Sequence, residues 1–188
     1  MARIALVGLW HLGTVAATGL ARLGHTVRAT DPDPDTVRRL QRLEPPLYEP
    51  GLAEALSHQT AAGRLLFDAD PRSVFSQAQY AFITFDTPVD ENDQSDLSPI
   101  FAAFDSLALH AHVPVTIVLM SQVPVGTCRT LDARLRAHAP HLDFHLVYHP
   151  ENLRLGDALK TFLSPDFLVV GAEVPAAADR LISLYAGV

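Results

Sequence analysis

The stretch Arg3–Asp31, RIALVGLWHLGTVAATGLARLGHTVRATD, decides the fold of this sequence. The apolar run Ile4–Val7 predicts a short buried strand, and Gly8 predicts a tight turn directly after it. The alanine- and leucine-rich segment Leu12–Leu23 predicts a helix, which should end at Gly24 because glycine readily takes the left-handed conformation that closes helices.

A second strand and an acid complete this unit. His25–Thr30 predicts the strand, and Asp31 follows it. The order of strand, glycine turn, helix, strand and acid is typical of the first βαβ unit of a dinucleotide-binding sheet, in which the acid holds an adenosine ribose. In the motif G-x-G-x-x-G, Gly8 and Gly13 occupy the outer positions and Trp10 the middle one. Because the middle glycine lets a pyrophosphate approach the backbone, we expect Trp10 to weaken such binding.

The rest of the chain continues to alternate strands with helices. Further strands are predicted at 63–68, 80–85, 115–120, 144–148 and 167–171, and the segment 149–162 is predicted to be a loop. This pattern predicts an α/β fold with a doubly wound, Rossmann-like parallel sheet of about six strands and helices on both faces. We expect residues 1–188 to form a single dinucleotide-binding domain.

Bulk properties exclude several classes of partner. The formal net charge is −7 and the sequence has no basic run, which argues against nucleic acid and against an anionic membrane surface. No apolar run reaches the roughly 18 residues that a membrane span needs. The N-terminus enters a strand pattern at once, so we expect no signal peptide, and the single cysteine, Cys128, excludes an internal disulfide. We therefore expect a cytoplasmic protein.

Other chemistries have weaker support in the sequence. The nine histidines do not combine with Cys, Asp or Glu at a recognised ligand spacing, so no metal site is predicted. Neither a G-x-S-x-G motif nor a Walker A motif is present, which argues against hydrolase and P-loop functions. Arg38, Arg39 and Arg42 follow the second strand and are open to two interpretations, contacts to an adenosine phosphate or a solvated helix face.

Four separated pieces of the sequence resemble one family. They are GLWHLG at 8–13 with Asp31, LYEPGL at 47–52, DTP at 86–88 with DLS at 96–98, and SQVPVGT at 121–127 with HPENLRLG at 149–156. In order and spacing they are similar to the N-terminal, NAD-binding domain of the UDP-glucose/GDP-mannose dehydrogenases. Those oxidoreductases convert the C6 alcohol of a sugar nucleotide to a carboxylate in two hydride transfers.

The resemblance implies NAD as the cofactor and assigns roles to particular residues. The implied cofactor-binding residues are Gly8, Trp10, His11, Leu12, Gly13, Asp31, Thr87 and Ser121, the last two along the nicotinamide half. Glu151 is implied as the acid/base or water-positioning carboxylate, with a loop or helix-cap carboxylate as the alternative interpretation. The segment 151–156 would approach the nucleotide-sugar substrate, with Arg154 as an anion contact.

The sequence also departs from the family pattern. Asp86 stands where the family usually has glycine, and four further departures are Gln122, His149, Asn152 and Leu155. A carboxylate about 5 Å from a phosphate oxygen would cost roughly 3 kcal/mol at an effective dielectric constant of 20. We therefore expect Asp86, together with Trp10, to weaken NAD binding.

In the family, the thiol nucleophile and its partner lysine lie in a later domain, whereas this sequence ends at Val188. Cys128 and Lys160 match no catalytic motif, so we expect that this polypeptide alone does not complete the oxidation. Three functions remain open: a truncated NAD-binding domain, a non-catalytic pseudoenzyme that serves as a partner or regulatory subunit, and a small enzyme that reuses the cofactor pocket. The expected partners are a nucleotide sugar and either a second copy of the chain or a second protein subunit.

Overall fold

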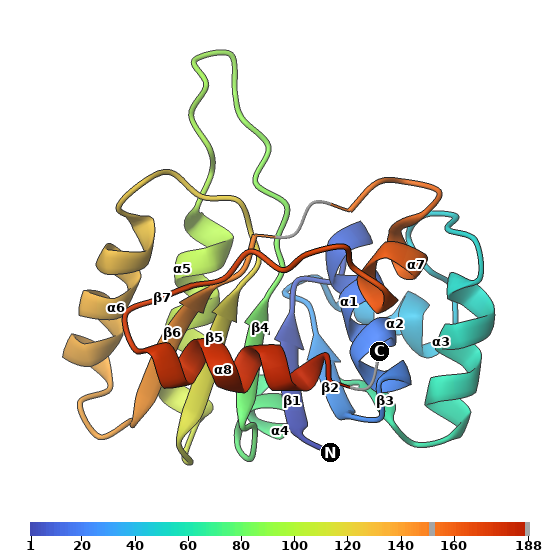
Figure 1. Cartoon of the computed structure of the whole chain (residues 1–188), viewed down its shortest axis with the longest axis horizontal. Helices are drawn as coiled ribbons and strands as arrows, with labels where there is room; N and C mark the ends of the chain where they lie inside the picture. Colours follow the sequence, from blue (N-terminus) through green and yellow to red (C-terminus); the bar gives the residue numbers. More distant parts are fainter. Residues whose placement is uncertain (151–152, 187–188) are drawn as a thin grey trace.

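The computed structural model describes residues 1–150 and 153–186. Within them, one seven-stranded sheet has the order β3-β2-β1-β4-β5-β6-β7 (Figure 1). Its strands are β1 (Arg3–Val7), β2 (Thr26–Thr30), β3 (Leu65–Phe67), β4 (Tyr80–Ile83), β5 (Val115–Leu119), β6 (Phe144–Tyr148) and β7 (Gly171–Ala172). Strands β1 to β6 are parallel, which confirms the predicted doubly wound α/β fold.

The C-terminal edge of the sheet differs from the prediction. The strand predicted at 167–171 is reduced to β7, which pairs antiparallel with β6 through Val147 and Ala172. The preceding residues leave the ladder, and the Val169 carbonyl accepts a hydrogen bond from Nδ1 of His149 at 2.7 Å. A side chain beyond the end of β6 thus takes the place of a strand partner.

Helices cover both faces of the sheet, as predicted. They are α1 (His11–Arg22), α2 (Pro34–Gln41), α3 (Leu52–Ala61), α4 (Pro71–Phe75), α5 (Ser98–His110), α6 (Thr127–His138), α7 (Ala158–Leu163) and α8 (Pro175–Leu184). Alternation along β1 sends Ile4 and Leu6 into a core with α1, α3, α7 and α8, and sends Ala5 and Val7 into a second core with α4, α5 and α6. The near-continuous burial of β1 and β5 is typical of central parallel strands.

Two connections shape the carboxyl edge of the sheet. Residues 86–97, between β4 and α5, project far beyond that edge, as the upper loop in Figure 1 shows, and Val89 and Ser95 form an isolated antiparallel bridge within them. The segment predicted as a loop at 149–162 instead contains the start of α7. None of the helices in the described part of the chain combines the length and apolar character required to cross a membrane.

Candidate functional site: a cavity at the carboxyl edge of the sheet

A cavity of about 730 Å³ opens where the strand order reverses between β1 and β4. Open α/β sheets bind ligands at this switch point, outside the carboxyl ends of the strands. The volume lies within the range usual for small-molecule sites. The lining comes from four strand ends and one later loop: Gly8, Leu9, Trp10, His11, Leu12, Asp31, Phe85, Asp86, Thr87, Pro88, Met120, Gln122 and Leu153.

The turn between β1 and α1 is built on two glycines with different tasks. Gly8 has a φ of +99°, and a Cβ there would lie 2.9 Å from the backbone nitrogen of Phe85. Gly13 lies inside α1, where a Cβ would lie only 1.7 Å from the carbonyl oxygen of Gly8. Thr84 locks the same carbonyl, because its hydroxyl donates to Gly8 O at 2.7 Å. Gly13 therefore lets α1 pack against the turn, and it is not among the residues that line the cavity.

Trp10 occupies the N-cap position of α1 and lines the cavity. Its φ of −75° suits any L-residue, so the backbone does not require glycine at this position. Half of its surface is exposed, at 50%. The N–H groups of the first turn of a helix lack partners within the helix and attract anions. The indole of Trp10 thus belongs to the residue that caps the α1 N-terminus, a helix end of the kind that attracts anions. That Trp10 weakens NAD binding stays a prediction.

Asp31 follows β2 and faces the same cavity. One carboxylate oxygen accepts from the backbone N–H of Leu9 at 2.6 Å, and the other accepts from that of Asp33 at 2.9 Å. Burial raises the pKa of the Asp31 carboxyl above its ordinary value, although both hydrogen bonds act in the opposite direction. The carboxylate retains lone pairs for further donors, which suits the hydroxyls of a ribose.

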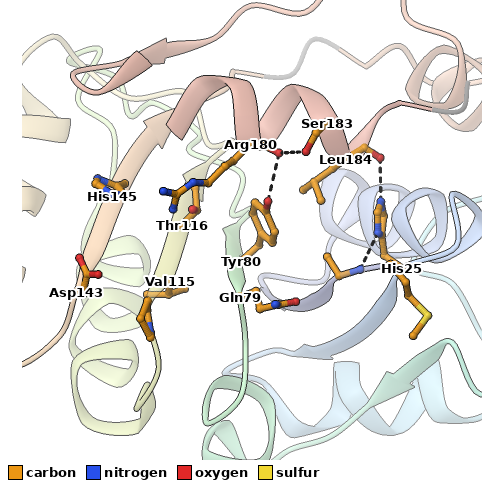
Figure 2. A pocket seen from close by; sticks show the side chains of 13 residues that line it. His25, Gln79, Tyr80, Val115, Thr116, Asp143, His145, Arg180, Ser183 and Leu184 are labelled. Carbon is orange, nitrogen blue, oxygen red and sulfur yellow. Dashed lines mark hydrogen bonds between the residues drawn. The ribbon is translucent and has the colours of Figure 1, made fainter. Parts of the chain in front are cut away.

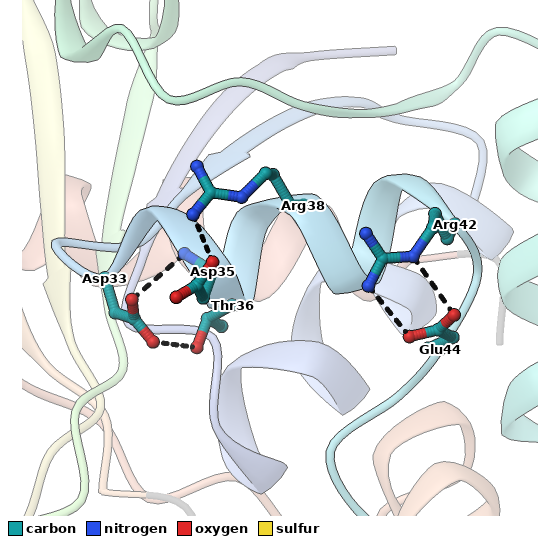
Figure 3. A network of polar contacts seen from close by, with 6 residues as sticks. All are labelled: Asp33, Asp35, Thr36, Arg38, Arg42 and Glu44. Carbon is teal, nitrogen blue, oxygen red and sulfur yellow. Dashed lines mark hydrogen bonds and ion pairs between the residues drawn. The ribbon is translucent and has the colours of Figure 1, made fainter.

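The arginines of α2 lie outside this lining. Figure 3 shows Arg38 paired with Asp35, one turn away, and Arg42 paired with Glu44 at 3.1 and 3.2 Å. Arg39 is exposed. These pairs lie on the exposed surface of α2 and its C-terminal end, an arrangement that favours the solvated-face interpretation over a phosphate site.

The loops after β4 and β5 form the far wall of the cavity. The hydroxyl of Thr87 donates to the carbonyl of Gln122 at 2.6 Å and so ties the two loops together. Partial desolvation raises the pKa of the Asp86 carboxyl above its ordinary value, and nearby His11 acts in the opposite direction. Ser121 is buried, and its hydroxyl finds no hydrogen-bond partner among the described residues. It is not among the residues that line the cavity, so its contact with the cofactor stays a prediction, and the predicted Glu151 lies outside the described residues.

Glu49 contacts a residue of the cavity lining, His11, although no role was predicted for it from the sequence. Only 3% of its surface is exposed. Its carboxylate accepts from the backbone N–H groups of Gly156 at 3.0 Å and Ala158 at 2.8 Å, and contacts Nε2 of His11 at 3.2 Å. Burial would raise the pKa of Glu49, but these three contacts outweigh it and hold the pKa below its ordinary value. Its sequence signal was its place in LYEPGL, at 47–52.

The sequence matches, over residues 2–188, the model of the UDP-glucose/GDP-mannose dehydrogenase family, NAD binding domain. The chain belongs to this family. It is 32% identical over 188 residues to UDP-glucose 6-dehydrogenase from Pseudomonas aeruginosa, a match that covers 98% of this chain and 42% of that protein. The Bacillus subtilis UDP-glucose 6-dehydrogenase YwqF is 30% identical over 97% of this chain and 42% of its own length.

Solved structures of family members agree closely with the fold. A UDP-glucose dehydrogenase from the archaeon Pyrobaculum islandicum superposes with a TM-score of 0.93 and 35% identity, covering 100% of this chain and 44% of that one. GDP-mannose dehydrogenase from Pseudomonas aeruginosa gives a TM-score of 0.92 at 26% identity, over 97% of this chain and 44% of that one. The chain thus spans less than half the length of these relatives.

Family membership identifies NAD as the cofactor of this domain. The residues present fit it in two respects: Gly8 and Gly13 allow α1 to pack closely on the turn after β1, so that the start of α1 lines the cavity, and Asp31 follows β2 at the same cavity. Of the implied cofactor residues, Gly8, Trp10, His11, Leu12, Asp31 and Thr87 line the cavity together. Within the described residues, no group of three or more His, Cys, Asp or Glu side chains gathers as a metal site.

A second cavity, of about 420 Å³, lies at the opposite, amino edge of the sheet (Figure 2). Here α8 is held to the strands, because the Tyr80 hydroxyl donates to the carbonyl of Arg180 at 3.3 Å. Nδ1 of His25 accepts a hydrogen bond from the N–H of Ala2 at 3.2 Å, and its Nε2 donates one to the carbonyl of Leu184 at 2.9 Å. These contacts secure the last helix, and the amino edge is not where dinucleotide sheets bind their cofactor.

Proposed function

We propose that this chain is the NAD-binding part of a nucleotide-sugar 6-dehydrogenase, acting in the cytoplasm on a UDP-sugar or a related sugar nucleotide. The supporting observation is the cavity at the switch point, where the glycine turn, the α1 N-terminus and Asp31 meet in the order that a dinucleotide requires. Membership of the family supports the same function.

Each part of the cavity has a distinct task in this proposal. Asp31 accepts the ribose hydroxyls of the adenosine half, and the first turn of α1 faces the pyrophosphate. The two loops joined by Thr87 and Gln122 border the nicotinamide half. NAD, when bound, supplies the hydride acceptor for oxidation of an alcohol. Glu151 would move the proton or orient a water in that reaction, by the resemblance alone.

The thiol chemistry of the family is expected to come from elsewhere than Cys128. This cysteine lies on α6 and lines a separate cavity of about 320 Å³ between α6, β6 and β7. Burial raises the pKa of the Cys128 thiol, which disfavours the nucleophilic thiolate. We therefore propose that a further domain, or a second subunit, completes the active site. The exposed apolar side chains Leu155, Phe167 and Val169 offer surface for such an association.

A titration with NAD tests the proposal, and the chain carries its own reporter. Trp10 is the only tryptophan in the sequence and lines the cavity. Seating of the cofactor should shift or quench its emission, with saturation at micromolar to millimolar NAD and agreement from calorimetry. A flat response in both measurements would overturn NAD binding. It would favour the non-catalytic partner role instead, which the indole and Asp86 at the cavity already support.

A further inference from the structure

Glu49 joins two segments that the sequence keeps far apart. It precedes α3, yet its carboxylate meets the first residue of α1 and the start of α7. We propose that Glu49 and His11 act together as a positioning pair, through which a cofactor seated on the first turn of α1 orients the segment 153–158. This inference rests on the proposed function, because that segment belongs to the loop expected to approach the sugar nucleotide.

The contacts of Glu49 with the segment replace a missing local cap. Among the described residues, the N-cap residue Asp157 makes no capping hydrogen bond with its own side chain. Glu49 instead accepts from the N–H groups of Gly156 and Ala158, 107 and 109 residues away in the chain. A buried carboxylate that accepts two backbone N–H groups is directional, since each oxygen must face its own donor. The start of α7 is therefore placed by the position of Glu49.

The other end of the pair reaches the cavity. His11 lines the cavity and holds Glu49 through Nε2, whereas Glu49 itself lies outside the lining. Leu153, at the start of the coupled segment, lines the same cavity. A displacement of the first turn of α1 on binding would thus pass through His11 and Glu49 to Gly156, and would return to the cavity wall at Leu153.

A competing route runs through the packing of α7 on α1. Phe162 lies so close to α1 that a Cβ at Gly19 would fall 2.3 Å from its ring. If this packing alone carried the displacement, Glu49 would serve only as a helix cap. The two routes give different results when Glu49 or His11 is altered, because neither change touches Phe162 or Gly19.

Hydrogen–deuterium exchange with and without saturating NAD tests the pair on the 188-residue chain. The variants are Glu49→Gln, which removes the charge and one acceptor, and Glu54→Gln, an exposed glutamate on α3, as the matched control. NAD should slow exchange over residues 8–14 in all three proteins. Over 153–158 it should slow exchange about fivefold or more in the wild type and in the control, the lower end of usual coupling between sites. In Glu49→Gln that second effect should disappear.

His11→Ala separates positioning from capping. It leaves both backbone contacts of Glu49 intact, so exchange of the NAD-free protein over 153–158 should match the wild type. Because His11 also lines the cavity, the NAD concentration is raised until residues 8–14 are protected as in the wild type; exchange over 153–158 should then no longer respond to NAD. The inference would be overturned if NAD still slowed exchange over 153–158 in Glu49→Gln. It would also be overturned if, in the wild type, NAD protected residues 8–14 but not 153–158. The proposal that the chain binds NAD would stand in both cases. Absence of protection at 8–14 in the wild type would instead overturn the proposed function, and the inference with it.

Discussion

Substitution of Gly13 by alanine should destabilise the protein at the turn between β1 and α1, although alanine is the better helix former. Intrinsic propensity alone predicts a gain of about 1 kcal/mol in a helix interior. In the structure, however, the new Cβ would lie 1.7 Å from Gly8 O and 2.8 Å from the hydroxyl of Thr84. To bring the new Cβ and Gly8 O even 3.0 Å apart, one of them must shift by about 1.3 Å. This shift strains the hydrogen bond that the hydroxyl of Thr84 donates to Gly8 O at 2.7 Å.

The expected loss combines overpacking with a weakened buried hydrogen bond. These cost about 1–3 and about 1 kcal/mol respectively, so we expect Gly13→Ala to lower the free energy of unfolding by about 2–4 kcal/mol. For a chain of this length that is a fall of roughly 4–16 °C in Tm, measured by circular dichroism. Gly171→Ala is the matched control, because the nearest atom to its new Cβ is 3.8 Å away. It should change stability by less than about 0.5 kcal/mol.

Two results would refute this reasoning at different levels. A Gly13→Ala protein as stable as the wild type would show that α1 does not pack on Gly8 as described. A destabilised but folded variant with unchanged affinity for NAD would show that the turn is not the seat of the cofactor.

Three further results are expected from the charged groups of the site. Asp86→Asn should tighten NAD binding about tenfold to a hundredfold at neutral pH, because it relieves about 1.4–3 kcal/mol of charge repulsion. Asp93→Asn in the same loop is the control and should leave the affinity for NAD, measured by calorimetry, unchanged. Because the folded pKa of Asp86 is raised, wild-type affinity for NAD should rise as the pH falls through that pKa, and the Asp86→Asn protein should lack this rise. The pKa of Glu49 is lowered in the folded protein, so the stability that its charge contributes is fully present above pH 4.5 and is lost as the pH falls through the folded-state pKa. On acidification, Glu49→Gln should therefore lose less free energy of unfolding than the wild type or Glu54→Gln, as measured by acid unfolding.

Local signals were sufficient for the part of the fold that holds the cofactor. The apolar run of β1, the glycine turn and the helix end at Gly24 lie within one continuous stretch, and each is a short-range feature. The order of strands followed from their alternation with helices. Asp31 could be placed at the cavity because the carboxyl ends of parallel strands share one edge.

Long-range contacts account for what the sequence did not reveal. The start of α7 is capped by Glu49, 109 residues earlier in the chain, whereas Asp157, which is of a residue type favoured at the N-cap, makes no capping hydrogen bond with its side chain. The strand predicted at 167–171 was shortened because His149 takes the Val169 carbonyl. Ser121 follows β5 between Met120 and Gln122, which both line the cavity, but is itself buried and outside the lining, so its expected contact with the cofactor stays a prediction.

The charges around the cavity explain how an anionic cofactor is accommodated beside acidic side chains. Among the described lining residues, His11 is the one side chain that is able to carry a positive charge, whereas Asp31 and Asp86 are both acidic. In the proposed placement of NAD, the partial positive charge of the α1 N-terminus, equivalent to about half a unit charge, would oppose Asp86 at the diphosphate. Asp31 would meet the neutral hydroxyls of the adenosine ribose, where its charge strengthens hydrogen bonds. We therefore expect the adenosine end to contribute most of the affinity, and substitutions near the diphosphate to increase the affinity most.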